Sequence, residues 1–199
     1  MQWQVIVVGA GPVGGRIATE LSKRDISVLL LEEHSEIGRP FQCAGLVNPP
    51  AMEMVNLEES ILNTIDGAHI HSPTGTMIPV GTEGIPRTHV VCRKRFDQGV
   101  VKQALEAGAQ IMLNTKPTDA FLEDDAMNVI VNSDGEEIHL KCDLLIGADG
   151  AHSWTRRHFK MGRPKEMMVG FQADVTGLTG PDKWLEMYTG EDIAPGFFA

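Results

Sequence analysis

The sequence predicts an α/β protein that begins with a strand, a glycine-rich turn, a helix and a second strand. Residues 3–8 form a short apolar run, which we expect to be a strand buried between layers of helices. Residues 16–23 then carry apolar side chains at helical spacing, and residues 27–32 form a second apolar run. Together they span roughly 30 residues, the length of a βαβ unit. We therefore expect a parallel sheet at the N-terminal end.

The later segments predict a second, smaller sheet and a return to the first one. Residues 68–71 and 76–80 alternate in polarity around a turn at 72–75, which indicates antiparallel strands of a separate sheet. The remaining expected elements are a helix at 96–107, a strand at 110–113, a meander at 121–122, 128–131 and 137–140 with a turn at 133–135, and a buried strand at 143–147.

Composition excludes several classes of protein. The formal net charge is −10 and the pI is about 5.1, which argues against a nucleic-acid partner. The apolar runs are far shorter than the roughly 18 residues of a membrane-spanning helix, and we expect no secretion signal, because residues 1–4 lead directly into the first predicted strand. Three widely spaced cysteines, Cys43, Cys92 and Cys142, favour reduced thiols and a cytoplasmic location. His69 and His71 lack further ligands at suitable spacing, so we expect no metal site.

The glycine-rich turn carries the first functional signal. Gly9 would allow the tight turn, Gly11 would let backbone approach a pyrophosphate, and Gly14 would allow close packing of helix on strand. Pro12 follows within the same turn, and the N-terminus of the helix offers free N–H groups to phosphates. A purely structural glycine turn is the alternative. We predict that this turn binds a dinucleotide.

An acidic pair closes the second strand. Glu32 lies roughly 20 residues after the glycines, where its carboxylate can accept hydrogen bonds from the adenosine ribose. Glu33 makes the local field more negative, so a 2′-phosphate would be repelled. The alternative for Glu32 is a solvated surface acid. These features alone do not separate FAD from NAD.

A second motif favours FAD. The apolar run 143–147 leads into Asp149 and Gly150, followed by Ser153 and Arg156. This segment resembles the Asp-Gly motif of glutathione-reductase-type flavoproteins, in the branch that includes the aromatic hydroxylases and the geranylgeranyl reductases. The resemblance implies that Asp149 and Gly150 lie near the flavin-side pyrophosphate. A strand-to-helix turn capped by Ser153 is the alternative interpretation.

A third motif narrows the resemblance to one family. Residues 36–45 are similar to a loop of the archaeal and plant geranylgeranyl reductases. The similarity lies in Glu36-Ile37-Gly38 and in Pro40-x-x-Cys43, which Ala44 and Gly45 follow. The resemblance implies that Cys43, Ala44 and Gly45 lie beside the isoalloxazine and the substrate cavity. A small buried hydrophobe is the alternative for Cys43.

Two further segments extend the resemblance along the chain. Arg93, Phe96 and Asp97 form a pattern that is similar to the start of the corresponding helix in the family. The resemblance implies that Arg93 lies close to the flavin. Residues 188–199 are similar to the family's Tyr-x-Gly and Ala-Pro-Gly stretch, which leads into a strand of the substrate domain. The alternatives are a surface arginine at a helix start and, for residues 193–198, ordinary core.

The resemblance implies a Rossmann-like FAD-binding domain of the glutathione-reductase type with a β-rich substrate region. We expect a discontinuous FAD-binding domain at 1–65 and 93–165, and a partial substrate domain at 66–92 and 166–199. Family members continue for about as many residues again, including a Gly-Asp-Ala segment that contacts the flavin. We therefore expect this chain to lack the family's C-terminal half and to leave apolar surface uncovered.

The implied activity is FAD-dependent reduction of carbon–carbon double bonds in the geranylgeranyl chains of isoprenoid lipids. Cys43 is our candidate catalytic residue on the substrate side, as a hypothesis. The sequence does not decide whether the reductant is NAD(P)H or ferredoxin. A lipid substrate is compatible with peripheral contact between the protein and a membrane. Two alternatives remain: a flavin monooxygenase of the aromatic hydroxylase type, and a non-catalytic FAD-binding fragment.

Overall fold

The structure is a computed structural model that describes residues 2–40, 43–177 and 179–195. The chain divides into two compact units, Met1–Gln42 with Arg93–Val169 and Cys43–Cys92 with Gly170–Ala199. Residues 43–65, which we expected in the first unit, group with the second. The reason is strand pairing, because two strands from this stretch pair with a strand at 88–91.

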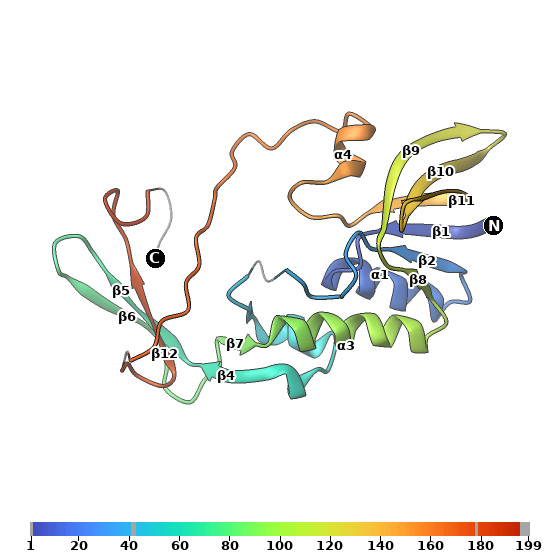
Figure 1. Cartoon of the computed structure of the whole chain (residues 1–199). Coiled ribbons are helices and arrows are strands. Elements are labelled where there is room, and N and C mark those ends of the chain that lie inside the picture. Colours follow the sequence, from blue (N-terminus) through green and yellow to red (C-terminus); the bar gives the residue numbers. More distant parts are fainter. Residues whose placement is uncertain (1, 41–42, 178, 196–199) are drawn as a thin grey trace. The chain divides into compact units, whose positions relative to one another are not determined.

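The first unit contains a six-stranded sheet in the order β8-β2-β1-β11-β10-β9 (Figure 1). β1 lies parallel to both β2 and β11, and β2 lies parallel to β8. β10 runs antiparallel to β9 and β11, as expected of the predicted meander. The strands are β1 (Gln2–Val8), β2 (Val28–Leu31), β8 (Gln110–Met112), β9 (Thr115–Glu123), β10 (Ala126–Ser133) and β11 (Glu136–Gly147). The predicted α/β class and Rossmann-like arrangement are confirmed.

Both faces of β1 are buried, which accounts for its unbroken apolar sequence. Val5 and Val7 belong to a core that includes Ala18 of α1 (Pro12–Ser22) and Val101 of α3 (Arg93–Glu106). The opposite face packs into a second core with β10 and β11, whose members include Ile6, Val8, Leu29, Val129 and Leu140. α1 and α3 approach closely, since a Cβ added at Gly15 would lie 2.9 Å from Val100 Cγ1.

The prediction of a separate, buried strand at 143–147 was wrong in two respects. These residues continue the meander strand within β11, which pairs with β10 as far as Cys142 and with β1 from Lys141 to Gly147. Leu144 is 53% exposed, whereas Ile146 packs at the edge of the first core. α1 contacts β1 and β2, and α3 contacts β8, whereas β11 is contacted by the five-residue α4, so part of β11 stays uncovered.

The second unit holds two three-stranded sheets, in the orders β12-β5-β6 and β3-β7-β4. The predicted hairpin is confirmed, because β5 and β6 pair antiparallel from Gly67 with Gly81 to His71 with Met77. β12 lies parallel to β5 on its other edge. The elements are β3 (Leu46–Val47), α2 (Pro49–Glu53), a 3-10 turn (Glu58–Ser60), β4 (Ile61–Ile65), β5 (Gly67–His71), β6 (Met77–Gly81), β7 (Thr88–Val91) and β12 (Trp184–Tyr188).

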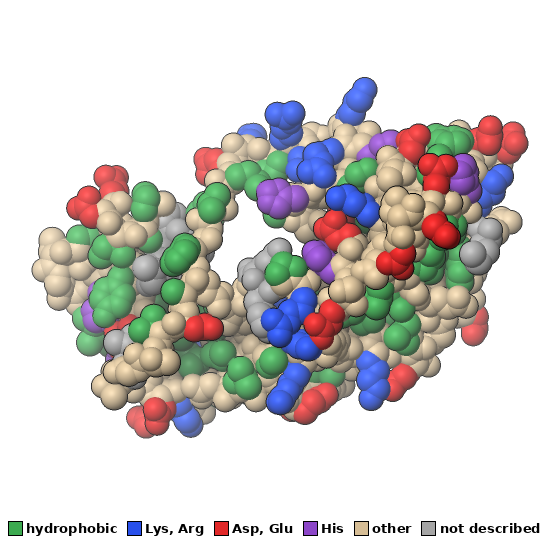
Figure 2. All heavy atoms as spheres, viewed as in Figure 1, with side chains coloured by type: hydrophobic (Ala, Val, Ile, Leu, Met, Phe, Trp, Pro, Cys, Tyr) green, Lys and Arg blue, Asp and Glu red, His purple; other side chains and the backbone are tan. Residues whose placement is uncertain are grey.

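Apolar side chains stay exposed in both units, as Figure 2 shows by the hydrophobic atoms on the visible face. Ile78 and Val80 of β6 are 57% and 52% exposed, and Leu122 of β9 is 69% exposed. Within the described part of the chain, no helix combines the length and apolar character needed to cross a bilayer.

Candidate dinucleotide site

The three glycines of the turn after β1 serve different purposes. Gly9 has φ +97°, and a Cβ there would lie 2.5 Å from the carbonyl oxygen of Ala148. A Cβ on Gly14 would lie 1.9 Å from the carbonyl oxygen of Gly9. A Cβ on Gly11, in contrast, would meet no atom within 4 Å. Two of the glycines are therefore required by the fold itself, while the third faces open space that a ligand can enter.

The start of α1 is suited to an anion. Gly11 is the N-cap and Pro12 follows it at the first helical position, where its missing N–H costs nothing. Among the described residues, no side chain caps this helix, and its first turn holds no acidic residue. The 11-residue helix directs its free N–H groups and positive dipole end toward the same open space. A pyrophosphate would find hydrogen-bond donors and no repelling carboxylate on this first turn.

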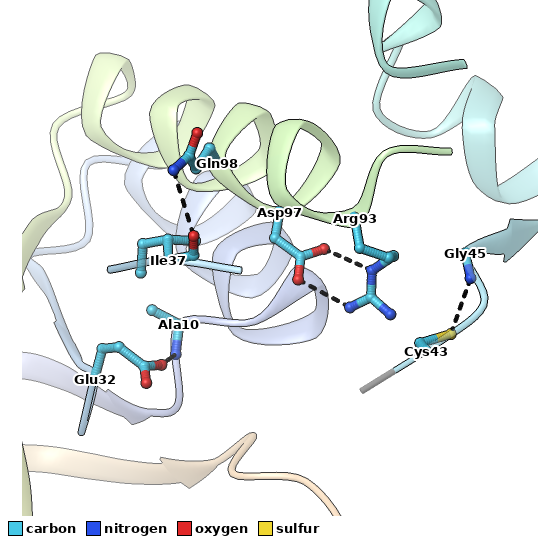
Figure 3. A network of polar contacts seen from close by, with 8 residues as sticks. All are labelled: Ala10, Glu32, Ile37, Cys43, Gly45, Arg93, Asp97 and Gln98. Atoms are coloured by element: carbon cyan, nitrogen blue, oxygen red, sulfur yellow. Dashed lines mark hydrogen bonds and ion pairs between the residues drawn. The ribbon is translucent and has the colours of Figure 1, made fainter. Parts of the chain in front are cut away.

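The carboxylate of Glu32 lies at this turn (Figure 3). Its Oε2 accepts a hydrogen bond from the Ala10 N–H at 3.0 Å. Its Oε1 accepts from the His34 N–H at 3.1 Å and lies 2.6 Å from the His34 Nδ1. Sequence reasoning did not single out His34, although its place two residues after the strand-end acid was a usable signal. Glu33 is not part of this cluster, because its carboxylate pairs with the exposed Lys116 at 3.4 Å.

Asp149 and Gly150 come to the same edge of the sheet from the end of β11. The Asp149 Cα would lie 3.0 Å from a Cβ on Gly9, so two motifs far apart in sequence meet at the carboxyl ends of β1 and β11. Asp149 Oδ2 accepts from the Thr155 N–H at 2.8 Å and from the Thr155 hydroxyl at 3.0 Å. Burial acts to raise the pKa of Asp149, but hydrogen bonds from Ser153 and Thr155 outweigh it and hold the pKa below its usual value. The carboxylate thereby fixes the start of α4 (Trp154–His158).

Arg93 opens α3, and two of its three guanidinium nitrogens contact Asp97 one turn later. Its Nε and Nη2 donate to the two carboxylate oxygens of Asp97, each at 2.9 Å, and Asp97 is buried (Figure 3). The same helix holds the loop after β2, since Gln98 Nε2 donates to the Ile37 carbonyl at 3.4 Å and Lys94 pairs with Glu36. The predicted place of Arg93 beside the flavin stays a prediction.

These contacts make the carboxyl edge of the first sheet our candidate dinucleotide site, and a comparison with family models identifies the dinucleotide. A model described as an FAD binding domain matches residues 2–197. The chain belongs to the family of FAD-binding domains. Its cofactor is FAD. The FAD-binding domain holds Gly9, Gly11, Pro12, Gly14 and Glu32 at one end of its sheet, where an open backbone position, a free helix start and a carboxylate fit the pyrophosphate and ribose of this cofactor.

Relatives of the FAD-binding domain confirm the resemblance to geranylgeranyl reductases. The chain is 32% identical to the digeranylgeranylglycerophospholipid reductase of Methanosarcina acetivorans and 33% identical to that of Methanocaldococcus jannaschii, in each case over 98% of this chain. These matches cover 50% and 51% of the two reductases. The chain therefore spans about half the length of the curated relatives it matches.

Solved structures show the same fold. A geranylgeranyl bacteriochlorophyll reductase-like protein from Thermoplasma acidophilum superposes with a TM-score of 0.81 at 22% identity, over 96% of this chain and 51% of that one. The anhydrotetracycline hydroxylase OxyS from Streptomyces rimosus has a TM-score of 0.69 at 25% identity, over 80% of this chain and 34% of that one.

Of the predicted flavin-side loop, residues 43–45 belong to the second unit. Cys43 is exposed, so its interpretation as a small buried hydrophobe was wrong, and its Sγ accepts from the Gly45 N–H at 3.4 Å. Ala44 lies between these two residues. Phe41 and Gln42 of the same loop lie outside the described residues. Cys142 provides a contrast, because it is fully buried and that burial raises the pKa of its thiol to about 11.

The C-terminal segment is described up to residue 195, so the predicted strand residues 196–199 lie outside the described part. Ile193 is 52% exposed, which does not fit ordinary core.

His69 and His71 both contact Glu186 across β5 and β12, with 2.8 Å between His69 Nδ1 and Glu186 Oε1. Among the described residues, no group of three or more histidine, cysteine, aspartate or glutamate side chains is arranged so that it could hold a metal ion.

Proposed function

We propose that this chain provides the FAD-binding part of an oxidoreductase that reduces carbon–carbon double bonds in the geranylgeranyl chains of isoprenoid lipids. The observation that carries this proposal is the identity of 32–33% with digeranylgeranylglycerophospholipid reductases along 98% of the chain. The open position at Gly11 and the carboxylate of Glu32 support it, because they fit the cofactor that such a reaction needs.

FAD held by these residues would, once reduced, be the source of the hydride for one carbon of the alkene. The residues of this chain have three tasks in the proposal. The start of α1 binds the pyrophosphate, and Glu32 accepts hydrogen bonds from the ribose hydroxyls. The third task is to donate a proton, because an isolated alkene accepts a hydride only if its other carbon is protonated.

We assign the proton to the thiol of Cys43. Its side chain is exposed in this chain, so a substrate can reach it, and the Gly45 N–H already donates to the Sγ. After the transfer, solvent returns a proton to the sulfur. Cys43 would thus be the catalytic residue, with Ala44 and Gly45 shaping the loop around it. A cytoplasmic location, which the free thiols favour, completes the proposal.

The test separates cofactor binding from activity. Retention of FAD is first measured by the visible absorbance of the desalted protein. The bound FAD is then reduced with dithionite, which makes the identity of the natural reductant, NAD(P)H or ferredoxin, irrelevant. Mass spectrometry of a digeranylgeranyl phospholipid should show the gain of two hydrogens for each reduced double bond. Full FAD retention without any such gain would contradict the proposed activity.

Cys43→Ala is the informative variant, with Cys92→Ala as its matched control because Cys92 is only partly exposed. We expect Cys43→Ala to bind FAD normally but to lose roughly a hundredfold or more of the reduction rate, the usual contribution of a general acid. Unchanged turnover would remove Cys43 from the mechanism and leave the reductase proposal standing.

A monooxygenase is the second candidate, favoured by the 25% identity with anhydrotetracycline hydroxylase over 80% of this chain. It predicts rapid NADPH oxidation that a phenolic substrate stimulates and that consumes oxygen. Failure of the chain to retain FAD at all would instead favour a non-catalytic fragment.

A further inference from the structure

Positive charge is concentrated in one short stretch of this acidic chain. Residues 156–165 hold five of the 17 lysines and arginines and none of the 27 aspartates and glutamates. The stretch comprises the last turn of α4 and the segment that follows it. Figure 2 shows lysine and arginine side chains gathered around α4 on the visible face. In a protein of net charge −10, this local excess calls for a physical explanation.

The basic side chains of this stretch are exposed and have no acidic partner. Arg157, Lys160, Arg163 and Lys165 are all exposed, and within the described residues no carboxylate lies within 4 Å of their charged groups. Seven other basic residues are paired with carboxylates: Arg16, Arg24, Arg39, Arg93, Lys94, Lys102 and Lys116. The difference leaves the stretch as a source of uncompensated positive charge.

The backbone keeps this stretch next to the helix. The Met161 N–H donates to the Arg156 carbonyl at 3.0 Å, and Arg156 Nη1 donates to the Gly162 carbonyl at 3.1 Å. Lys160 with φ +51° and Gly162 with φ +89° provide the turn. The charges beyond α4 are therefore held near those on its last turn.

Exposed apolar side chains are interleaved with the charges and continue after them. Phe159 is 38% exposed, Met161 71%, Met167 56%, Met168 66% and Val169 98%. Methionine is flexible and apolar, which suits contact with a fluid lipid surface better than a fixed protein pocket. Basic residues beside exposed apolar ones are the combination that lies in a membrane interface, with the charges among headgroups and the apolar groups below them.

We infer that residues 156–169, the basic–apolar segment, dock this protein on a membrane surface that carries anionic phospholipid headgroups. The segment holds five basic residues and one acidic residue, Glu166. The inference rests on the proposed function, since a geranylgeranyl phospholipid substrate would reside in such a membrane. The charge complementarity is local: outside the segment acidic residues far outnumber basic ones, so an anionic surface attracts this part of the chain and repels the rest. Each lysine or arginine adds roughly fivefold to the affinity for such a surface.

The test is co-sedimentation of the FAD-loaded protein with vesicles. One set contains phosphatidylcholine alone, and the other contains equal parts of phosphatidylcholine and phosphatidylglycerol. The unaltered protein should bind only the anionic vesicles, and less strongly at high salt. Replacing Arg157, Lys160, Arg163 and Lys165 by glutamine should weaken binding by roughly a hundredfold or more. Changing Met161, Met167 and Met168 to serine should weaken the binding that remains at high salt.

The matched control replaces four exposed lysines elsewhere, Lys23, Lys102, Lys141 and Lys183, by glutamine and so makes the same change in net charge. It should bind vesicles within about twofold of the unaltered protein, because these lysines lie outside the segment. Three results would each overturn the inference: equal losses of binding in the two variants, binding to neutral vesicles, or competition by duplex DNA as strong as that by anionic lipid. FAD absorbance reports whether every variant is folded. Vesicle binding without alkene reduction would contradict the proposed function and leave the docking surface standing.

Discussion

The backbone N–H of Ala10 donates to Oε2 of Glu32, with 3.0 Å between the two atoms. This contact links the turn after β1 to the end of β2, so one carboxylate closes the edge of the sheet. We assign the ribose of the cofactor to the same carboxylate. Since Oε1 accepts from the His34 N–H and lies 2.6 Å from its Nδ1, the side chain is held in place before any ligand arrives.

Replacing Glu32 by glutamine should therefore weaken FAD binding. The amide can present only one acceptor oxygen, and hydrogen bonds to a charged acceptor contribute roughly 1.5–3 kcal/mol, so we expect a loss of about tenfold to a hundredfold in affinity. Quenching of FAD fluorescence during titration measures it. Glu33→Gln is the matched control, because Glu33 pairs with the exposed Lys116 and should change affinity by less than about twofold. Equal losses in the two variants would contradict this assignment.

The glycine turn predicts a contrast between two alanine variants. Gly14→Ala would place a Cβ 1.9 Å from the Gly9 carbonyl oxygen, so the turn must distort and the variant should lose several kcal/mol or fail to fold. Gly11→Ala meets no atom within 4 Å and has an ordinary φ of −75°, so the free protein should keep its stability. Its FAD affinity should still fall at least about tenfold, because the new methyl group occupies the space for the pyrophosphate.

Thermal unfolding and FAD titration of the two variants provide the measurements. Normal FAD binding by Gly11→Ala would show that the open position beside Gly11 is not the cofactor cradle. A fully stable Gly14→Ala variant would show that the close approach to Gly9 can relax without cost.

Local sequence patterns were sufficient to predict the first sheet and the glycine turn. The apolar run of β1 and the spacing from Gly9 to Glu32 are local, and each follows from backbone geometry and burial on both faces. Pairing between distant segments was not predictable in this way. β12 aligns with β5 across more than 100 residues, and the exposure of Leu144 depends on which strands the helices cover. The pairing of Arg93 with Asp97, in contrast, is local, because the two residues lie four positions apart on α3, a spacing that our sequence analysis did not use.

The low pKa of Asp149 predicts a loss of stability in acid. Hydrogen bonds from Ser153 and Thr155 favour the charged form, so the folded-state pKa lies below the ordinary value of 3.8. This stabilisation is present above pH 3.8 and disappears as the pH falls through the lower folded-state pKa. At neutral pH, Asp149→Asn should cost about 1 kcal/mol, because the carboxylate is partly solvated and anchors a helix start.

Urea unfolding of the two proteins between about pH 7 and pH 2 measures this difference. The curves should converge toward the acid end as the carboxylate of Asp149 becomes protonated in the folded protein as well. A stability gap that stays constant over the whole range would show that the charge of Asp149 is not what stabilises α4. Asp143→Asn, at an exposed position of β11, is the control and should leave the pH dependence unchanged.

The three cysteines should react with iodoacetamide at very different rates. Cys43 is exposed and should be alkylated quickly in the native protein, while Cys92 is partly exposed and should be slower. Cys142 is fully buried, and burial raises the pKa of its thiol to about 11, so neither access nor a thiolate is available at neutral pH. Peptide mass spectrometry after a short reaction gives the order. Cys142 should react only when urea unfolds the first sheet, so its modification measures global opening. Native-state labelling of Cys142 as fast as of Cys43 would contradict the packing of β11 against β1 and β10.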